Sequence, residues 1–269
     1  MSRARHRGRV NSVWRGPLPL VAAGVLIAAF VGWSYLSSRA TPAPSATAGE
    51  AAVVAAAATG VPADVLDRVG AGSASAHLTR TQLPLLKGTS GRPLVVYVGA
   101  DFCPFCASER WSLVVALSRF GTFRDLGLTR SSSSDVFPDT ATFSFRGSAY
   151  ASDLVEFSSV ETADRAGAPQ ERPDAVQQAA MDRSDPRGAI PFVSIADRYV
   201  GVGSGYSPDV LRGKTWMEIA EQLRDPASPV ARAALGNANR ITAAICEVTA
   251  GAPAAVCASP AVKGLGPSK

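Results

Sequence analysis

The stretch that most constrains the fold is a valine-rich run that leads into two closely spaced cysteines. Residues 94–98, L-V-V-Y-V, form a continuous apolar run, which is typical of a strand buried on both faces. Cys103 and Cys106 follow in the motif C-P-F-C. Over 104–120 most residues are apolar and follow a helical period, and Gly121 is a residue type that ends helices. The sequence therefore predicts a buried strand, a cysteine pair and an apolar helix in direct succession.

A strand followed by a helix, with C-x-x-C at the junction, is the first βα step of a thioredoxin-type fold. We therefore expect the α/β class, with a thioredoxin-like fold that has an enlarged middle insertion and an extra C-terminal helix. The later elements expected are a second parallel strand, two extended segments that pair as a hairpin, a helix, another hairpin and two further helices: 126–132, 141–146 with 154–160, 174–182, 190–196 with 198–202, 216–223 and 228–249.

The two cysteines of the motif have different expected roles. A cysteine at a helix N-terminus faces unpaired backbone N–H groups and the positive end of the helix dipole, and both favour the thiolate. Cys103 occupies this position and is predicted to be the accessible, attacking sulfur. Cys106 lies one turn further on, within disulfide reach, and is predicted to be the buried resolving sulfur. Pro104 suits the first helical turn, where its missing N–H costs nothing.

A redox pair of this kind needs a surface on which a client chain can dock. Thioredoxin folds provide a cis proline opposite the pair, preceded by a residue whose backbone pairs with the client. Ile190-Pro191, at the start of an expected strand, is the best candidate, and we predict a cis bond there. The alternative is a trans proline that begins an edge strand. Ile190, Pro191 and Phe105 are the predicted substrate-binding residues.

The N-terminal region predicts a membrane anchor. Residues 17–36 carry no charge, and 20 helical residues span about 30 Å, the thickness of the hydrocarbon layer. Five arginines precede this segment and only Arg39 closely follows it, so residues 1–16 should be a cytoplasmic basic tail. Residues 37–60, rich in Ala, Pro, Thr and Ser, are expected to be a flexible linker. A cleaved signal peptide is the alternative, and both place the following residues outside the cytoplasm.

The remaining cysteines, Cys246 and Cys257, are predicted to form a structural disulfide, the default outside the cytoplasm. The alternative is a relay that passes electrons to the motif. A zinc site is disfavoured because a C-x10-C spacing lacks the second knuckle of such sites. The chain has only two histidines, His6 and His77, which excludes a multi-histidine metal centre. We expect His77 to be a surface residue, and we expect no cofactor.

The basic charge of the chain is concentrated at its start. Five arginines precede the first acidic residue, Glu50. Removing those five from the 27 lysines and arginines leaves 22, equal to the 22 aspartates and glutamates. This balance argues against a nucleic-acid-binding surface on the folded part. The neighbouring charges Glu109 and Arg110, on the helix after the motif, are expected to be solvated or paired with each other.

Three segments resemble a known family. They are G-R-P-L-V-V-Y-V-G-A-D-F-C-P-F-C-A-S-E-R-W-S-L-V-V-A-L-S-R-F-G, T-F-S-F at 142–145 and I-P-F-V at 190–193. Together with the terminal two-cysteine region they are similar to a family of uncharacterised, membrane-anchored thioredoxin-like proteins. The resemblance covers roughly residues 61–258, which we take as the extracytoplasmic domain, with 259–269 as a disordered tail.

The expected function is that of a single-pass membrane protein whose extracytoplasmic domain exchanges thiols and disulfides with cysteines of secreted or membrane proteins. If it is a net oxidant, a membrane quinone-linked reoxidase should recharge it. If it is a reductant, a membrane electron conduit should supply it. The alternative is a binding or assembly module on a thioredoxin-like scaffold in which the Cys103–Cys106 bond is only structural.

Overall fold

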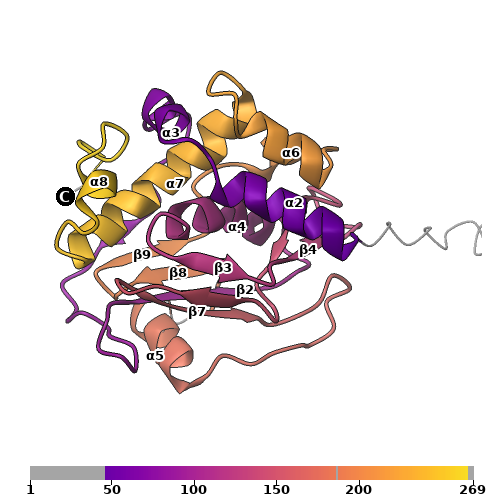
Figure 1. Ribbon diagram of the computed structural model, residues 1–269. Helices are drawn as coiled ribbons and strands as arrows, with labels where there is room; N and C mark the ends of the chain where they lie inside the picture. Colours follow the sequence, from indigo (N-terminus) through magenta and orange to yellow (C-terminus); the bar gives the residue numbers. More distant parts are fainter. Residues whose placement is uncertain (1–45, 186, 266–269) are drawn as a thin grey trace, which may run out of the picture. The chain divides into compact units, whose positions relative to one another are not determined.

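A five-stranded mixed sheet forms the middle of the fold, with helices on both of its faces (Figure 1). The computed structural model describes residues 46–185 and 187–265, so the predicted tail 1–16 and anchor 17–36 lie outside the described residues. The strand order is β1-β9-β8-β2-β7. Its members are β1 (Thr79–Arg80), β2 (Leu94–Gly99), β7 (Glu156–Glu161), β8 (Phe192–Ile195) and β9 (Tyr199–Val202). β2 and β7 are parallel, whereas β8 and β9 run antiparallel to their neighbours.

The helices differ in which face of the sheet they cover. The α-helices are α2 (Ala48–Thr59), α3 (Ala63–Val69), α4 (Pro104–Leu117), α5 (Ala175–Ser184), α6 (Trp216–Gln222), α7 (Pro229–Val248) and α8 (Ala254–Cys257), with a 3-10 turn η1 at Pro208–Leu211. In Figure 1, α4, α2 and α7 lie on one side of the sheet and α5 lies on the other. The fold is therefore mixed α/β with two cores, one on each side of the sheet.

The continuous apolar run of β2 is explained by these two cores. Val95 and Tyr97 point into the larger core, which they share with α4 and α7. Leu94, Val96 and Val98 point into the smaller core, against α5. Successive side chains of a strand face opposite sides of its sheet, so a strand covered on both faces needs apolar residues at every position.

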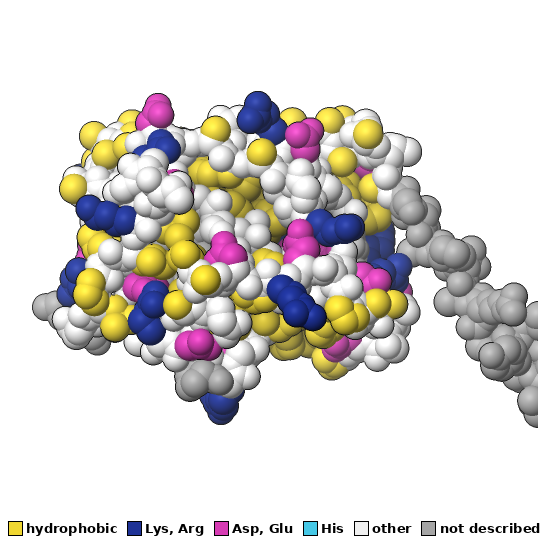
Figure 2. All heavy atoms as spheres, turned by 90° about the horizontal axis from the view of Figure 1, so that it is seen from below, with side chains coloured by type: hydrophobic (Ala, Val, Ile, Leu, Met, Phe, Trp, Pro, Cys, Tyr) yellow, Lys and Arg dark blue, Asp and Glu magenta, His cyan; other side chains and the backbone are white. Residues whose placement is uncertain are grey.

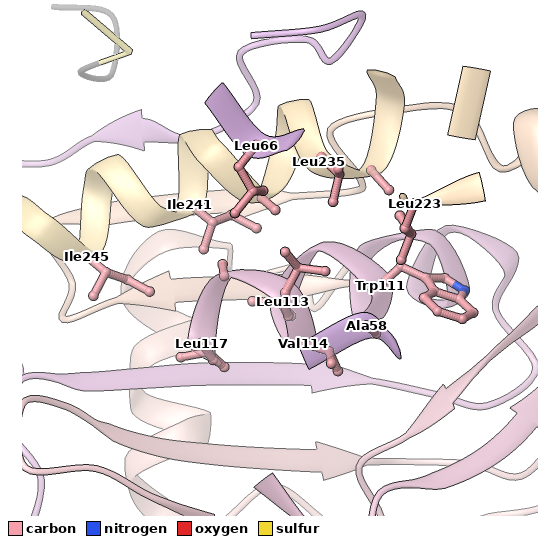
Figure 3. Packing of buried hydrophobic residues seen from close by; sticks show 14 of the residues in the cluster. Ala58, Leu66, Trp111, Leu113, Val114, Leu117, Leu223, Leu235, Ile241 and Ile245 are labelled. Atoms are coloured by element: carbon pink, nitrogen blue, oxygen red, sulfur yellow. The ribbon is translucent and has the colours of Figure 1, made fainter. Parts of the chain in front are cut away.

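The larger core is built mainly where α4 packs against α7. In Figure 3, Leu113 and Leu117 of α4 lie beneath Ile241 and Ile245 of α7. Each fully buried leucine or isoleucine contributes about 1.5–3 kcal/mol relative to an exposed one. The indole N–H of Trp111 donates to the carbonyl of Ala141, 2.9 Å away, so its polar group is satisfied. This packing fixes α4, and with it the cysteine motif at its start.

The middle insertion differs from the prediction. The segment 126–132 was expected as the next parallel strand, but β4 (Gly127–Arg130) pairs antiparallel with β5 (Ala141–Ser144) in a separate two-stranded sheet. β3 (Thr122–Arg124) and β6 (Ala149–Ala151) form another such pair. The parallel neighbour of β2 is β7, which was expected to pair with the 141–146 segment instead.

The physical reason lies in the residue types of the insertion. β4 is half-buried and partly polar, which suits a strand outside the central sheet. Phe157 of β7, by contrast, joins Phe123, Phe145 and Tyr150 in an aromatic cluster, with ring centroids 5.0–5.9 Å from its own. Aromatic pairs at such distances stabilise beyond their buried area. This cluster anchors β7 at the sheet edge.

The folded unit extends beyond the predicted bounds at both ends. At the N-terminal end it begins at Ala46 rather than at residue 61. The second half of the predicted linker 37–60 forms α2, whose Val54 and Ala58 are fully buried. At the other end, the predicted disordered tail 259–269 includes Ala261 and Val262, which are buried in the larger core. The segments were mistaken for linker and tail because both are rich in small residues, which here allow close packing.

Within residues 46–185 and 187–265, none of the helices is by itself long and apolar enough to cross a membrane. Taken as one unit, α2 and α3 meet the length and composition criteria, but they are bent by 63° with respect to each other.

The surface charges of the folded unit are mixed. On the face drawn in Figure 2, basic and acidic side chains lie among one another and apolar side chains are scattered between them. This face has no continuous area of one sign, the kind of area that binds a nucleic-acid backbone.

Candidate functional site

The C-P-F-C motif lies at the junction between the central strand and the helix behind it. β2 ends at Gly99, and Cys103 is the N-cap residue of α4, with Pro104 in the first turn. The Cys103 sulfur accepts a hydrogen bond from the backbone N–H of Cys106 at 3.1 Å. Both cysteines are free thiols here. Cys106 is fully buried and Cys103 is 6% exposed, so the expected attacking sulfur is less accessible than the sequence suggested.

The pKa values of the two thiols move in opposite directions. The pKa of Cys103 is lowered, first by a hydrogen bond from the Cys106 thiol, against the raising effect of burial, and further by backbone N–H groups and by Arg110. The pKa of Cys106 is raised well above its usual range, first by burial and then by the adjacent Cys103 sulfur. The pair therefore holds its first negative charge on Cys103.

A buried charge network lies behind the motif, and the sequence interpretation missed it. Arg110 is fully buried and forms a two-bonded ion pair with Glu161 of β7, at 2.8 and 2.6 Å. Its Nη2 also donates to the carbonyl of Ala100, in the turn that leads to Cys103, at 2.7 Å. Asp101 Oδ1 lies 3.7 Å from the same Nη2. Arg110 thus links α4, β7 and the motif turn.

Glu109 faces a different part of the protein. Its carboxylate lies 3.3 Å from Nε2 of His77 and accepts a 2.9 Å hydrogen bond from the side-chain amide of Asn237 on α7. The side chains of His77 and Glu109 are only 8% and 0% exposed, so the expectations of a surface histidine and of a solvated or mutually paired Glu109 and Arg110 were wrong. Adjacent helical residues point about 100° apart, and each of these charges therefore needed its own partner.

A glycine-rich stretch makes room for this second cluster. A Cβ atom on Gly205 would lie 2.1 Å from Oδ1 of Asn237 and 2.9 Å from Nδ1 of His77. A Cβ on Gly201 would lie 2.9 Å from the His77 ring. Gly201 and Gly205 are thus required for close packing over the histidine, and their place in the G-V-G-S-G stretch was the signal that could have revealed a buried group there.

The predicted docking residues lie at the same end of the sheet as the motif. Val98 pairs with Phe192 in the antiparallel register between β2 and β8, which places Pro191 beside Gly99. The Ile190–Pro191 bond is cis, the isomer that the sequence analysis predicts. Among the described residues, neither the N–H nor the C=O of Ile190 makes a backbone hydrogen bond. The Pro191 carbonyl accepts a bond from the N–H of Gly203 at 2.8 Å.

Phe105 lies on the surface beside the cysteines. It is 39% exposed, and its ring meets Phe137 edge to face with centroids 5.8 Å apart. The guanidinium of Arg212 lies 5.2 Å from the Phe137 ring centre, a cation–π distance. A pocket of about 340 Å³ opens next to Phe102 and is also lined by Ser132 and Arg165. The surface around Cys103 therefore offers exposed aromatic area and a small polar pocket.

The second cysteine pair lies away from the motif. Cys246 and Cys257 form a disulfide that joins α7 to α8, which is the predicted pairing. Figure 3 shows Ile245, the neighbour of Cys246, beside Leu117 at the C-terminal end of α4. From Cys106 to Leu117 the helix rises about 16 Å, so this disulfide and the motif are at opposite ends of α4. That separation disfavours a direct electron relay between the two pairs.

The residues that the structure describes contain no group of three or more histidine, cysteine, aspartate or glutamate side chains arranged to hold a metal ion.

Part of the chain is similar to one family of proteins. A family model described as "Domain of unknown function (DUF929)" matches residues 86–167. The match includes β2, the cysteine motif, α4, the insertion and β7, and it supports the resemblance to a family of uncharacterised proteins. No curated protein and no solved structure gives a significant match.

Proposed function

We propose that this chain is a membrane-anchored, extracytoplasmic thiol–disulfide oxidoreductase with a thioredoxin-like fold. The observation that carries the proposal is the asymmetry of the cysteine pair. Cys103 caps a helix and has a lowered thiol pKa, whereas Cys106 lies fully buried behind it with a raised pKa. Such an asymmetry suits one sulfur for attack and the other for resolution.

The topology supports the fold assignment. The order β9-β8-β2-β7, in which only β2 and β7 are parallel, is that of the four-stranded sheet of thioredoxin folds. The helix that follows β2 begins at the cysteine pair, and a proline precedes β8 at the same sheet end. The insertion is an addition to this arrangement.

The proposed exchange is a pair of displacement steps. In client oxidation, a client thiolate attacks the Cys103 sulfur of the Cys103–Cys106 disulfide, and Cys106 leaves as a thiolate. A second client thiolate then attacks the client sulfur of the mixed disulfide. The client disulfide forms, Cys103 leaves as a thiolate, and the pair has gained the two electrons that the client lost. Client reduction follows the same steps in reverse.

Two features support a docking role for this surface: the Ile190 backbone, which makes no hydrogen bond to other residues that the structure describes, and the exposed ring of Phe105. An extended client chain would pair with Ile190 beside Pro191 and place its cysteine against Cys103. The clients are secreted or membrane proteins with cysteines. The pair would be recharged by a quinone-linked reoxidase or supplied by a membrane electron conduit, according to the direction of net transfer.

The experiment that tests the exchange is trapping in cells. Cys106→Ser removes the resolving sulfur, so mixed disulfides through Cys103 should accumulate and migrate as reductant-sensitive bands. Cys103→Ser, a matched loss of one motif thiol, should give few such bands. Equal trapping by the two variants, or none by either, would contradict the proposal.

The anchor is tested by topology. Residues 17–36 are proposed to lie in the bilayer with the N-terminus in the cytoplasm. Protease added to intact, wall-stripped cells should then remove the folded domain and leave a small membrane stub. Full protection of the domain would show that the orientation is wrong.

The low exposure of Cys103 favours one second candidate, a binding or assembly module whose Cys103–Cys106 bond is only structural. Thiol titration across a series of redox buffers separates the two functions. A redox-active pair opens and closes reversibly within the series, whereas a structural bond stays closed throughout.

A further inference from the structure

The buried Arg110 network has more donors than its visible partners use. In the Arg110 guanidinium, Nε and Nη2 donate hydrogen bonds to the Glu161 carboxylate, and Nη2 also donates to the Ala100 carbonyl. Its Nη1 is buried and has no hydrogen-bond partner among the described residues. A buried donor on a charged group that lacks a hydrogen-bond acceptor destabilises the fold. The guanidinium also lies 5.9 Å from the centre of the Tyr97 ring, a cation–π distance.

The position of Arg110 relates this free edge to the cysteines. Arg110 follows Cys106 by four residues on α4, and side chains four apart lie on the same face of a helix. The Ala100 carbonyl that it holds belongs to the turn that leads into Cys103. The ion pair with Glu161 holds the guanidinium from the side of β7.

We propose that Arg110 is a positioning residue that stabilises negative charge on the cysteine pair, on Cys103 at rest and on Cys106 during exchange. This inference rests on the proposed thiol–disulfide exchange. When a client thiolate attacks Cys103 of the oxidised pair, the bond between the two sulfurs breaks and its electron pair leaves with Cys106. The Cys106 thiolate forms in a fully buried position, four residues before Arg110 on the same helix, and later takes a proton from solvent.

The electrostatics agree with this geometry. Burial raises the pKa of Cys106 most, and Arg110 acts against it; for Cys103, Arg110 adds to the lowering by hydrogen bonds. Glu161 and Asp101 are the carboxylates of the network, and both contact the guanidinium from its Nη2 side. Because the disulfide is uncharged and the reduced pair carries a thiolate, a fixed cation favours the reduced form. A pair whose reduced form is stabilised in this way is a stronger oxidant of its clients.

The test compares the parent folded unit with a variant that carries Arg110→Met and Glu161→Gln together. Removing both charges avoids an unpaired buried carboxylate, which would destabilise the fold. We expect the first thiolate of the reduced pair, followed by its ultraviolet absorbance, to titrate about one pH unit higher. We also expect the equilibrium with a redox buffer to move about tenfold toward the disulfide, which corresponds to about 30 mV.

Two further variants separate charge from packing. Arg110→Lys keeps the cation and loses the two-bonded geometry, so it should recover part of both shifts. Glu109→Gln removes a buried charge from the adjacent helical position, on the side facing His77, and should leave both readouts at the parent values. Near-ultraviolet circular dichroism checks that each variant keeps its tertiary packing.

These measurements test the role of Arg110 separately from the proposed thiol–disulfide exchange. Parent values for thiolate titration in the folded double variant would overturn it, as would equal shifts in Glu109→Gln. If the double variant does not fold, the same titration of Arg110→Lys is the test. A thiolate that titrates no higher than in the parent would contradict a role for the two-bonded Arg110 guanidinium. If the parent pair never opens in redox buffer, the proposed function fails, while titration of the chemically reduced pair still tests Arg110.

Discussion

The sulfur of Cys103 accepts the backbone N–H of Cys106 over 3.1 Å, so the first turn of α4 binds the sulfur that caps it. This contact favours an unprotonated sulfur at Cys103, since a thiolate is a far better acceptor than a thiol. Backbone N–H groups supply part of the pKa lowering, and the Cys106 thiol supplies the largest part. The two contributions can be separated by substitution.

We predict that alkylation of Cys103 in the reduced protein has its pH midpoint below the usual range of a cysteine thiol, because the pKa of Cys103 is lowered. Cys106→Ala removes the thiol hydrogen bond and leaves the backbone one, so the midpoint should move to higher pH. The measurement is the rate of iodoacetamide modification against pH, with the site assigned by mass spectrometry. An unchanged midpoint in Cys106→Ala would show that the second sulfur does not tune the first.

The buried pair of His77 and Glu109 predicts a pH-dependent stability. Burial alone lowers the pKa of His77, but Glu109 outweighs burial and the net pKa is raised above 6.5, with Arg240 opposing and the Ser75 backbone assisting. The folded state therefore binds the histidine proton more tightly than the unfolded state does. This contribution to the free energy of unfolding is complete below pH 6.5 and is lost as the pH rises through the raised pKa.

The measurement is the urea midpoint of the folded unit, 46–269, at several pH values between 5.5 and 8.5. His77 is the only histidine in that span, so His77→Gln should flatten this part of the profile. Asp64→Asn, at an exposed ion pair with Arg68, is a suitable control and should keep the parent profile. A parent profile that rises with pH over this range would contradict the assignment.

The central elements could be predicted because their patterns are strong. The all-apolar β2, the helix after the motif and the hairpin of β8 and β9 each have a clear period and clear ends. The strand pairing of the insertion could not be predicted, because the sequence of a short, half-polar strand such as β4 does not specify which strand it pairs with. Pairing there depends on an aromatic cluster that gathers Phe123, Phe145 and Phe157 from separate segments.

The candidate site also has a part that could be predicted from the sequence and a part that could not. Cys103, Cys106 and the proline at 191 are recognised by residue type and spacing, and the register of β2 with β8 brings them to one sheet end. The partners of Arg110 and Glu109 lie 51 residues away at Glu161 and 128 residues away at Asn237. The local periodicity of apolar residues carries no information about contacts between residues so far apart in the sequence. The clue was chemical, since two charged residues inside an apolar helix require buried partners.

The position of α2 predicts that the domain boundary matters for stability. A protein that begins at residue 61, as the sequence suggested, loses the helix that buries Val54 and Ala58. Burial of one valine contributes at least about 1.5 kcal/mol, so this truncation should be less stable by about 2 kcal/mol or more than one that begins at residue 46. Chemical denaturation of the two proteins measures the difference. Equal stabilities would mean that the helix is dispensable and that the shorter domain is complete.

The disulfide between Cys246 and Cys257 should stabilise the fold without taking part in exchange. It closes a loop with a sequence separation of 11, for which the chain-entropy model gives about 3 kcal/mol. The double variant Cys246→Ala/Cys257→Ala should therefore melt roughly 6–12 °C lower, the range expected for a domain of this size. Thermal denaturation gives the shift, and Cys103 alkylation and redox equilibration of the motif should keep their parent values, because α4 separates the two pairs. If the double variant stays folded but the motif no longer equilibrates with thiols, the second pair passes electrons to the first. The disulfide would then be a relay, and α7 and α8 would have to move toward the motif during turnover.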